Sequence, residues 1–134
     1  MNINLIELQQ HGDERGALVS LECNKNIPFD IRRVYYIYNT NKNVVRGYHA
    51  HRKLKQMAIC VKGYCTFTLD DGFERISIKL DNPAQGLLIE SCLWREMSDF
   101  SEDCVLLVLA DADYDELDYI REYETFKKIV RRIT

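Results

Sequence analysis

Short apolar segments separated by turn residues are the feature that most constrains the fold of this chain. Turn signals fall at Lys62-Gly63, at Asp70-Asp71-Gly72 and at Asn82-Pro83, between segments in which apolar and polar residues partly alternate. Alternation with a period of two is typical of antiparallel strands buried on one face. Strands are predicted over residues 17–22, 33–38, 55–61, 64–70, 75–80, 87–89 and 104–110. This pattern predicts an all-β fold, a closed barrel or sandwich of the jelly-roll kind whose cavity can hold one small ligand.

The apolar pattern changes after Asp115, where apolar residues recur every three or four positions. Acidic residues come early in this segment and basic residues late, as the dipole of a helix favours. We therefore predict a C-terminal amphipathic α-helix from Asp115 onward, which closes one end of the barrel or packs across a subunit boundary. Its apolar residues are Leu117, Ile120, Tyr123, Phe126, Val130 and Ile133.

The size and charge of the chain narrow the classes of function. Its 134 residues, 46% of them hydrophobic, predict one globular domain over residues 1–134. The formal net charge of −3 provides no overall basic surface, so we expect no nucleic-acid partner. No apolar stretch approaches membrane-spanning length and the N-terminus lacks a leader pattern, so we expect a cytoplasmic protein with no membrane partner.

The cysteines do not form a recognisable motif. There are five, an odd number, and none of them forms a C-x-x-C pair. We interpret them as reduced packing residues, because free cysteine behaves as a small apolar side chain.

The triplet His49-Ala50-His51 is the strongest candidate for chemistry. On a β-strand the two imidazoles project to the same face, about 7 Å apart along the strand, and we expect them to share one cavity. Such a pair serves either as metal ligands or as proton-transfer groups near neutral pH. A third interpretation, that both histidines are satisfied core or rim residues, also stays open.

Arginine and tyrosine residues complete the candidate site. Arginine binds phosphate groups with two parallel hydrogen bonds, and a tyrosine hydroxyl can stabilise an oxyanion or relay a proton. A phosphorylated sugar would suit this set, although any of the arginines could instead form a surface ion pair of little energetic value. The residues are Arg15, Arg33, Arg46, Arg95 and Tyr35.

The histidine segment resembles the first motif of the cupin superfamily, which implies the jelly-roll barrel. That motif has Gly, His-x-His, Glu and Gly at fixed spacing, and this chain keeps the spacing but has Asn43 and Gln56 where the first Gly and the Glu are expected. Arg95 stands where the superfamily's fourth ligand, a histidine, would be. An amide is a poor ligand and a guanidinium repels a divalent cation, so we expect no metal and no cofactor.

Five longer segments resemble the sugar 3,4-ketoisomerases of the WxcM-like cupin group. The resemblance implies a homodimeric, metal-free cupin that converts dTDP-4-keto-6-deoxy-D-glucose into a dTDP-3-keto-6-deoxyhexose, a precursor of 3-amino sugars in bacterial surface glycans. By the same resemblance, His49 is the catalytic base and His51 relays a proton or binds the enediol. We assign Tyr35 to the developing oxygen charge, and Arg15, Arg33 and Arg46 to the sugar and pyrophosphate. The segments are residues 13–18, 24–29, 32–37, 46–51 and 114–121.

One departure concerns the segment Trp94-Arg95-Glu96-Met97, in which relatives often have His at the second position. Because arginine is a poor acid near pH 7, we hypothesise that Arg95 fixes the substrate and alters control over the configuration at C4, galacto or gluco. Three other functions remain open: a sugar-nucleotide-binding cupin without catalysis, a metal-dependent cupin enzyme, and a sugar-nucleotide 3,5-epimerase.

Overall fold

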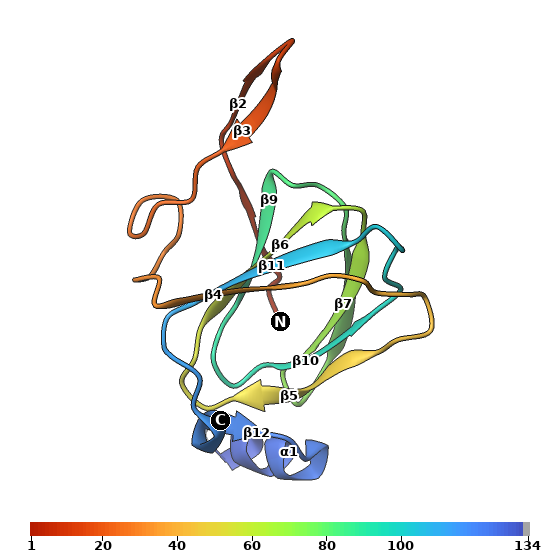
Figure 1. The fold of residues 1–134 in the computed structure, drawn as a ribbon. Helices are drawn as coiled ribbons and strands as arrows, with labels where there is room; N and C mark the ends of the chain where they lie inside the picture. Colours follow the sequence, from red (N-terminus) through yellow and green to blue (C-terminus); the bar gives the residue numbers. More distant parts are fainter. Residues whose placement is uncertain (133–134) are drawn as a thin grey trace.

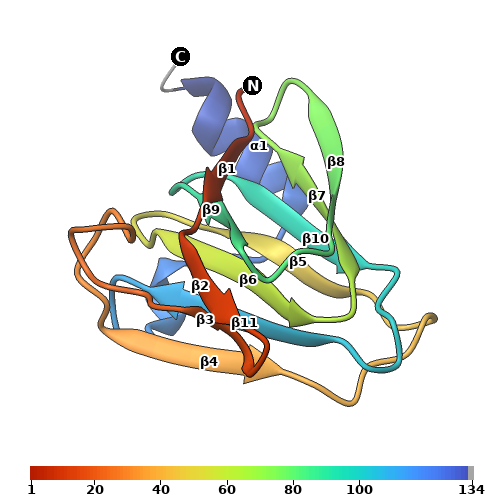
Figure 2. The same cartoon turned by 90° about the horizontal axis from the view of Figure 1, so that it is seen from above.

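The computed structural model describes residues 1–132 and places most of the strands in two five-stranded antiparallel sheets. In spatial order, the first sheet contains β1 (Asn4–Glu7), β9 (Gln85–Ile89), β6 (Gln56–Lys62), β11 (Val105–Ala110) and β4 (Arg33–Ile37). The second contains β12 (Tyr119–Ile120), β5 (Arg46–His51), β10 (Trp94–Ser98), β7 (Cys65–Asp70) and β8 (Arg75–Leu80). Figures 1 and 2 show the two sheets facing each other around a common interior.

The interior is filled by the inward-facing residues of both sheets. On β6, Ala58 and Cys60 point inward and are fully buried, whereas Met57 and Ile59 belong to a second cluster on the other face of the same sheet. Phe67 and Leu69 meet them from β7, so apolar side chains of the two sheets pack against each other. This arrangement confirms the predicted cupin-type jelly-roll barrel, because alternating strands can bury one face only by closing on a second sheet.

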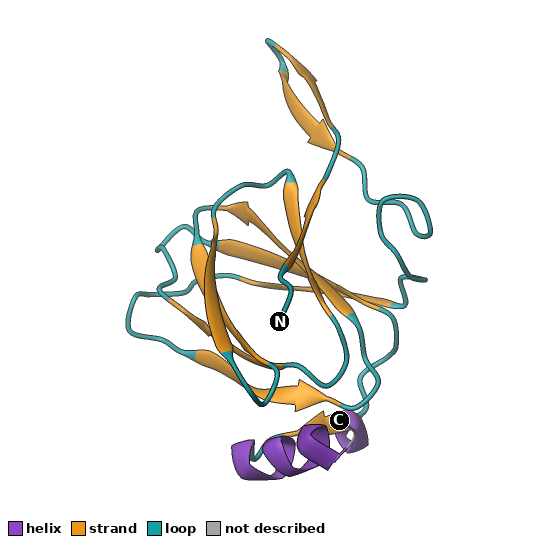
Figure 3. Cartoon of the chain, turned by 180° about the vertical axis from the view of Figure 1, so that it is seen from behind, coloured by secondary structure: helices purple, strands orange, loops and turns teal. Residues whose placement is uncertain are grey.

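A separate hairpin extends away from the barrel. Strands β2 (Gln10–Asp13) and β3 (Gly16–Val19) pair only with each other, and nearly all of their residues are exposed. Figure 1 shows the hairpin projecting beyond the sheets, at the opposite end of the molecule from the C-terminal helix, and Figure 3 shows the same arrangement from behind. The predicted strand over residues 17–22 is therefore wrong in its second half. Asn26 accepts a hydrogen bond from the backbone of Glu22, which starts a turn there.

The predicted C-terminal helix is wrong in its first half. The carboxylate of Asp115 accepts a hydrogen bond from the Leu117 backbone and begins a 3₁₀ turn, η1 (Glu116–Asp118), which leads into β12. Leu117, expected on the buried face, is 86% exposed. The helix α1 spans only Tyr123–Arg132, and Ile133 lies outside the described residues.

Helix α1 covers one end of the barrel, as predicted. Phe126 and Val130 are buried in a small cluster with Trp94 of β10 and Ala50 of β5. Burying the aromatic ring of Phe126 removes a large apolar area from water, which fixes the helix beneath the strand that carries the histidines. No helix among residues 1–132 has the length and apolar character needed to cross a membrane.

The remaining predicted strands agree with the structure to within two residues at each end. They correspond to β4, β6, β7, β8, β9 and β11. The sequence did not reveal β1, β2, β10 or β12, because these strands are short or mix apolar with charged residues.

Candidate active site

Strand β5 brings the two histidines together. The centroids of the His49 and His51 rings lie 4.9 Å apart, and the rings meet edge to face at 86°. The strand is bulged just before them: Gly47 has a φ of 91° and Tyr48 a φ of 57°, and the pairing with β10 changes register opposite this point. A Cβ on Gly47 would lie 2.8 Å from the carbonyl oxygen of Arg95, so only glycine permits this close approach of the two strands.

His51 is held by a carboxylate from the segment before helix α1. Its Nδ1 lies 3.2 Å from Oδ2 of Asp118, and the same carboxylate accepts hydrogen bonds from the backbone N–H groups of Lys53 and Leu54. A carboxylate only accepts here, so Nδ1 carries the proton and Nε2 keeps a lone pair. That Nε2 is buried and has no hydrogen-bond partner in the protein.

His49 is oriented by the backbone in the same manner. Its Nδ1 lies 3.1 Å from the carbonyl oxygen of Gly47. Because a carbonyl oxygen can only accept, Nδ1 of His49 carries the proton and its Nε2 also keeps a lone pair. Both imidazoles thus have the tautomer that a general base requires.

Both histidines are uncharged at neutral pH. Burial, together with the positive charge of Arg95, lowers the pKa of His49 to about 4 and that of His51 to about 2. The charged form is disfavoured because it loses hydration and faces a guanidinium. The two rings are therefore available to accept protons near pH 7.

Behind the histidines lies a buried hydrogen-bonded chain. Arg95 is 2% exposed, pairs with His49 across β10 and β5, and donates hydrogen bonds to the Leu93 carbonyl and to the side chain of Gln56. Gln56 in turn donates to the hydroxyl of Tyr35 over 3.0 Å. Burial lowers the pKa of Arg95 to about 10 and raises that of Tyr35, so the first stays charged and the second neutral near pH 7.

These hydrogen bonds connect the two metal-ligand positions at which the sequence departs from the cupin motif. Where that motif has a carboxylate and a histidine ligand, Gln56 and Arg95 bind each other. Among residues 1–132, the only group of three side chains close enough to share a metal ion consists of cysteines and includes neither histidine. A fixed guanidinium next to two imidazoles also repels a divalent cation, so the residues present do not fit the superfamily's metal centre.

The histidines lie at the junction of two adjoining hollows that share lining residues. His49 lines a hollow of about 480 Å³ together with Tyr35, Arg46 and Tyr119 of β12. His51 lines a neighbouring hollow of about 230 Å³, and Tyr119 and Arg33 border both. The two rings are in edge-to-face contact where these hollows meet.

The predicted arginines occupy three different environments. Arg33 and Arg46 line the larger hollow, and the guanidinium of Arg33 lies 5.4 Å from the centre of the Tyr35 ring. Arg95 lies beneath the hollow rather than in it. Arg15 is at the tip of the projecting hairpin, bound to Asp13, with a side chain that is 84% exposed. Within one chain, the hairpin of β2 and β3 projects away from the end of the barrel where β5 lies (Figure 1), so Arg15 is not brought to the histidines.

Sequence reasoning missed three residues that shape the site. The ring of Tyr119 packs at a tilt against both imidazoles, with its centroid 4.9 Å from that of His49 and 4.3 Å from that of His51. The guanidinium of Arg121 lies 4.2 Å from the centre of the Tyr119 ring, and Asp118 binds His51. All three lie in the segment over which we predicted a helix, so the incorrect secondary structure hid them. The only available signal was the resemblance of residues 114–121 to the ketoisomerases.

Comparison with known proteins identifies the family. The model that describes FdtA, a WxcM-like C-terminal domain, matches residues 1–131. This chain belongs to the FdtA family. One relative, the TDP-4-oxo-6-deoxy-α-D-glucose-3,4-oxoisomerase of Aneurinibacillus thermoaerophilus, is 50% identical over 133 residues, which cover 99% of this chain and 96% of that protein.

Solved structures of ketoisomerases have the same fold as this FdtA member. The 3,4-ketoisomerase QdtA from Thermoanaerobacterium thermosaccharolyticum, in complex with TDP, superposes with a TM-score of 0.96 at 45% identity, covering 98% of this chain and 96% of QdtA. A 3,4-ketoisomerase from Helicobacter canadensis superposes with a TM-score of 0.95 at 44% identity, covering 98% of each chain.

Proposed function

We propose that this chain is a sugar 3,4-ketoisomerase that converts TDP-4-keto-6-deoxyglucose into a TDP-3-keto-6-deoxyhexose by proton transfer, without a metal ion. The observation that carries the proposal is the pair of touching imidazoles, each with Nδ1 bound to an acceptor and Nε2 left with a lone pair. The FdtA relative that is 50% identical to this chain is named for the same reaction.

The chemistry requires a base beside C3 and an acid beside C4. The C4 carbonyl acidifies the C3 hydrogen, and His49, which faces the larger hollow, removes it to give an enediolate. The proton on the C3 oxygen then leaves, a proton is returned to C4, and the carbonyl is at C3. Because its surroundings lower the pKa of His49 to about 4, its imidazolium readily gives the proton back. His51 relays or holds a proton on the neighbouring side.

Tyr35 and the buried arginine stabilise the oxygen charge of the enediolate. Burial raises the pKa of Tyr35 and its oxygen already accepts a bond from Gln56, so the hydroxyl hydrogen is free to be donated to the substrate. Arg95 adds a fixed positive charge in a buried setting, where such a charge acts strongly. Arg33 and Arg46, which line the hollow, contact the sugar and pyrophosphate.

The whole chain acts as one cupin domain and pairs with a second copy. Support for a homodimer comes from the hairpin, which contacts little of its own barrel, and from exposed apolar side chains on it and on β4. Leu18 is 60% exposed, and Val34 and Tyr36 are 53% and 63% exposed. Exchange of the hairpin between subunits would cover these residues and carry Arg15 toward the partner's site.

The cysteines support a cytoplasmic location, because every one of the five is a free thiol and a reducing compartment preserves thiols. In the cytoplasm, we expect the 3-keto product to be a precursor of amino sugars of bacterial surface polysaccharides.

The reaction is tested by incubating the enzyme with TDP-4-keto-6-deoxyglucose in D₂O and following C3, C4 and C5 by NMR. We expect the carbonyl signal to move from C4 to C3, and His49→Asn to abolish the change. Glu122→Gln is the control, because Glu122 is exposed and lines neither hollow. Deuterium at C3 or C5 with the carbonyl still at C4 would indicate an epimerase, and binding without any exchange a non-catalytic protein. Loss of turnover on chelation, restored by a divalent ion, would refute the metal-free mechanism.

A further inference from the structure

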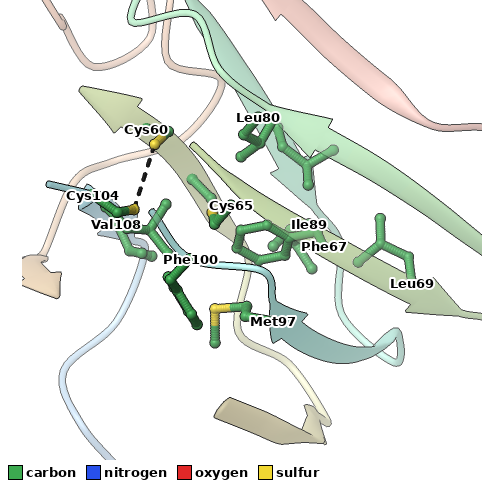
Figure 4. Close-up of a cluster of buried hydrophobic side chains, with 13 residues drawn as sticks. Cys60, Cys65, Phe67, Leu69, Leu80, Ile89, Met97, Phe100, Cys104 and Val108 are labelled. Carbon is green, nitrogen blue, oxygen red and sulfur yellow. Dashed lines mark hydrogen bonds between the residues drawn. The ribbon is translucent and has the colours of Figure 1, made fainter. Parts of the chain in front are cut away.

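Three cysteines that are far apart in the sequence meet at the end of the barrel away from the histidines. Cys60 comes from the end of β6, Cys65 from the start of β7, and Cys104 from the residue before β11. Their sulfur atoms all lie within 4.8 Å of one another, and Sγ of Cys60 is 3.7 Å from Sγ of Cys104. Figure 4 shows the three side chains converging beside the apolar core.

The thiol cluster is remote from the candidate active site. Gln56, Ala58 and Cys60 share the inward face of β6, so the cluster lies about 13 Å along this strand from the amide that binds Arg95. No step of the proposed isomerisation uses these thiols. Besides packing in the apolar core, the three cysteines place three sulfur atoms, which are soft donors, within reach of a single ion.

The spacing suits an ion bound to all three sulfurs. With metal–sulfur bonds of about 2.3 Å, sulfur atoms that share one ion lie roughly 3.5 to 4 Å apart. The separation of Cys60 and Cys104 already falls in this range, and small side-chain rotations would bring Cys65 into it. The three thiols are 0%, 0% and 1% exposed, so water is poorly placed to act as a fourth ligand.

Charge decides which kind of ion fits. Three thiolates around a divalent cation have a net charge of −1, and burying an uncompensated charge is costly. Asp103, in the turn beside the cluster, adds to this cost, because its negative charge opposes further negative charge on Cys60 and Cys104. A trivalent ion bound to three thiolates is neutral overall, and its complex can be buried without this penalty.

We infer that Cys60, Cys65 and Cys104 form a binding site for a trivalent thiophilic ion of the arsenite class, held by three sulfur atoms. Arsenous acid is neutral when it enters. Three As–O bonds break and three As–S bonds form, while each thiol proton leaves with a hydroxyl as water, so the step involves no oxidation and no net charge. Because the three thiols are buried, entry requires local opening at this end of the barrel, where the turn at Gly63 lies against Ser101 and the backbone of Cys104.

The test uses the full-length reduced protein and arsenite. After gel filtration we expect one arsenic atom per chain, with three sulfur neighbours and no oxygen by X-ray absorption at the arsenic edge. Cys65→Ala should lose the third sulfur and release arsenic faster, as should Cys104→Val if the first variant does not fold. Cys92→Ser and Cys23→Ser are matched controls, because those thiols lie outside the cluster, and both should retain the ion.

Two results would overturn the inference. One is arsenic that is not retained, or that is retained by oxygen ligands in the wild-type protein. The other is tight stoichiometric retention of Zn²⁺ in place of arsenite, which would show that the charge argument is wrong. Isomerase turnover should be unchanged with arsenic bound, because the cluster lies at the other end of the barrel from the histidines.

Discussion

Removing the carboxylate of Asp118 tests whether the tautomer of His51 matters. Asp118 accepts three hydrogen bonds, from Nδ1 of His51 and from the backbone N–H groups of Lys53 and Leu54. In Asp118→Ala the proton on Nδ1 loses its acceptor, so the imidazole can move the proton to Nε2. The side chain then presents a donor where the proposed reaction needs a lone pair.

The expected magnitude follows from these bonds. A hydrogen bond to a charged group is worth about 1.5–3 kcal/mol, and 1.4 kcal/mol changes an equilibrium tenfold. Loss of the bond to His51 therefore shifts the tautomer ratio, and with it kcat, by roughly tenfold to a hundredfold. Leaving the partly buried N–H of Leu54 without a partner lowers the free energy of unfolding by a further 1–3 kcal/mol or so.

Asp118→Asn separates tautomer control from simple loss of structure. The amide can turn its oxygen toward His51 and Leu54, so we expect most of kcat to return, while its NH2 group faces the exposed Lys53 N–H donor to donor and lowers stability. Glu122→Ala, in the same segment but exposed and outside both hollows, should turn over normally. Steady-state kinetics and ¹⁵N NMR of the imidazoles measure both effects. Asp118→Ala with wild-type kcat and an Nε2–H tautomer would refute the reasoning.

Three further predictions concern other parts of the molecule. Arg95→His should change the ratio of C4 epimers in the product measured by NMR, and identical products at equal rates would remove Arg95 as a stereochemical determinant. Because the folded-state pKa of His49 is about 4, against 6.5 when unfolded, the unfolded chain binds more protons between these values. The free energy of unfolding should therefore fall as the pH decreases from 6.5 toward 4, and His49→Gln should flatten this slope in denaturant titrations; an unchanged slope would contradict the assignment. Phe126→Ala should cost about 3–5 kcal/mol of stability and Leu117→Ala less than about 0.5, and equal losses in thermal unfolding would show that α1 is not anchored as described.

The sequence was sufficient to predict the barrel and the histidine pair. Alternation of apolar and polar residues sets which face of a strand is buried, and His49 and His51 share a face for the same reason. The position of Arg95 next to His49 could not be derived, because it depends on pairing between β10 and β5.

The C-terminal segment shows where periodicity misleads. Leu117 and Ile120 fit a helical spacing, but the Asp115 side chain caps a 3₁₀ turn and Ile120 pairs with Ala50 as a strand. Local hydrogen bonding and a tertiary strand pairing override the helical pattern there. Tyr119 and Asp118 reach the histidines only because of this pairing, so no local pattern could have identified them.

The bulge at Gly47 has a consequence for attempts to redesign substrate preference. Any larger residue there meets the backbone of Arg95 and separates two strands, which would displace His49 and the buried guanidinium together. Mutagenesis libraries should therefore leave this glycine untouched and diversify Ile37 and Met97, which line the hollow and have no role in the proposed proton transfer. The close approach of β5 and β10 at Gly47 thus fixes the catalytic groups, whereas other residues that line the hollow can be changed without moving these strands.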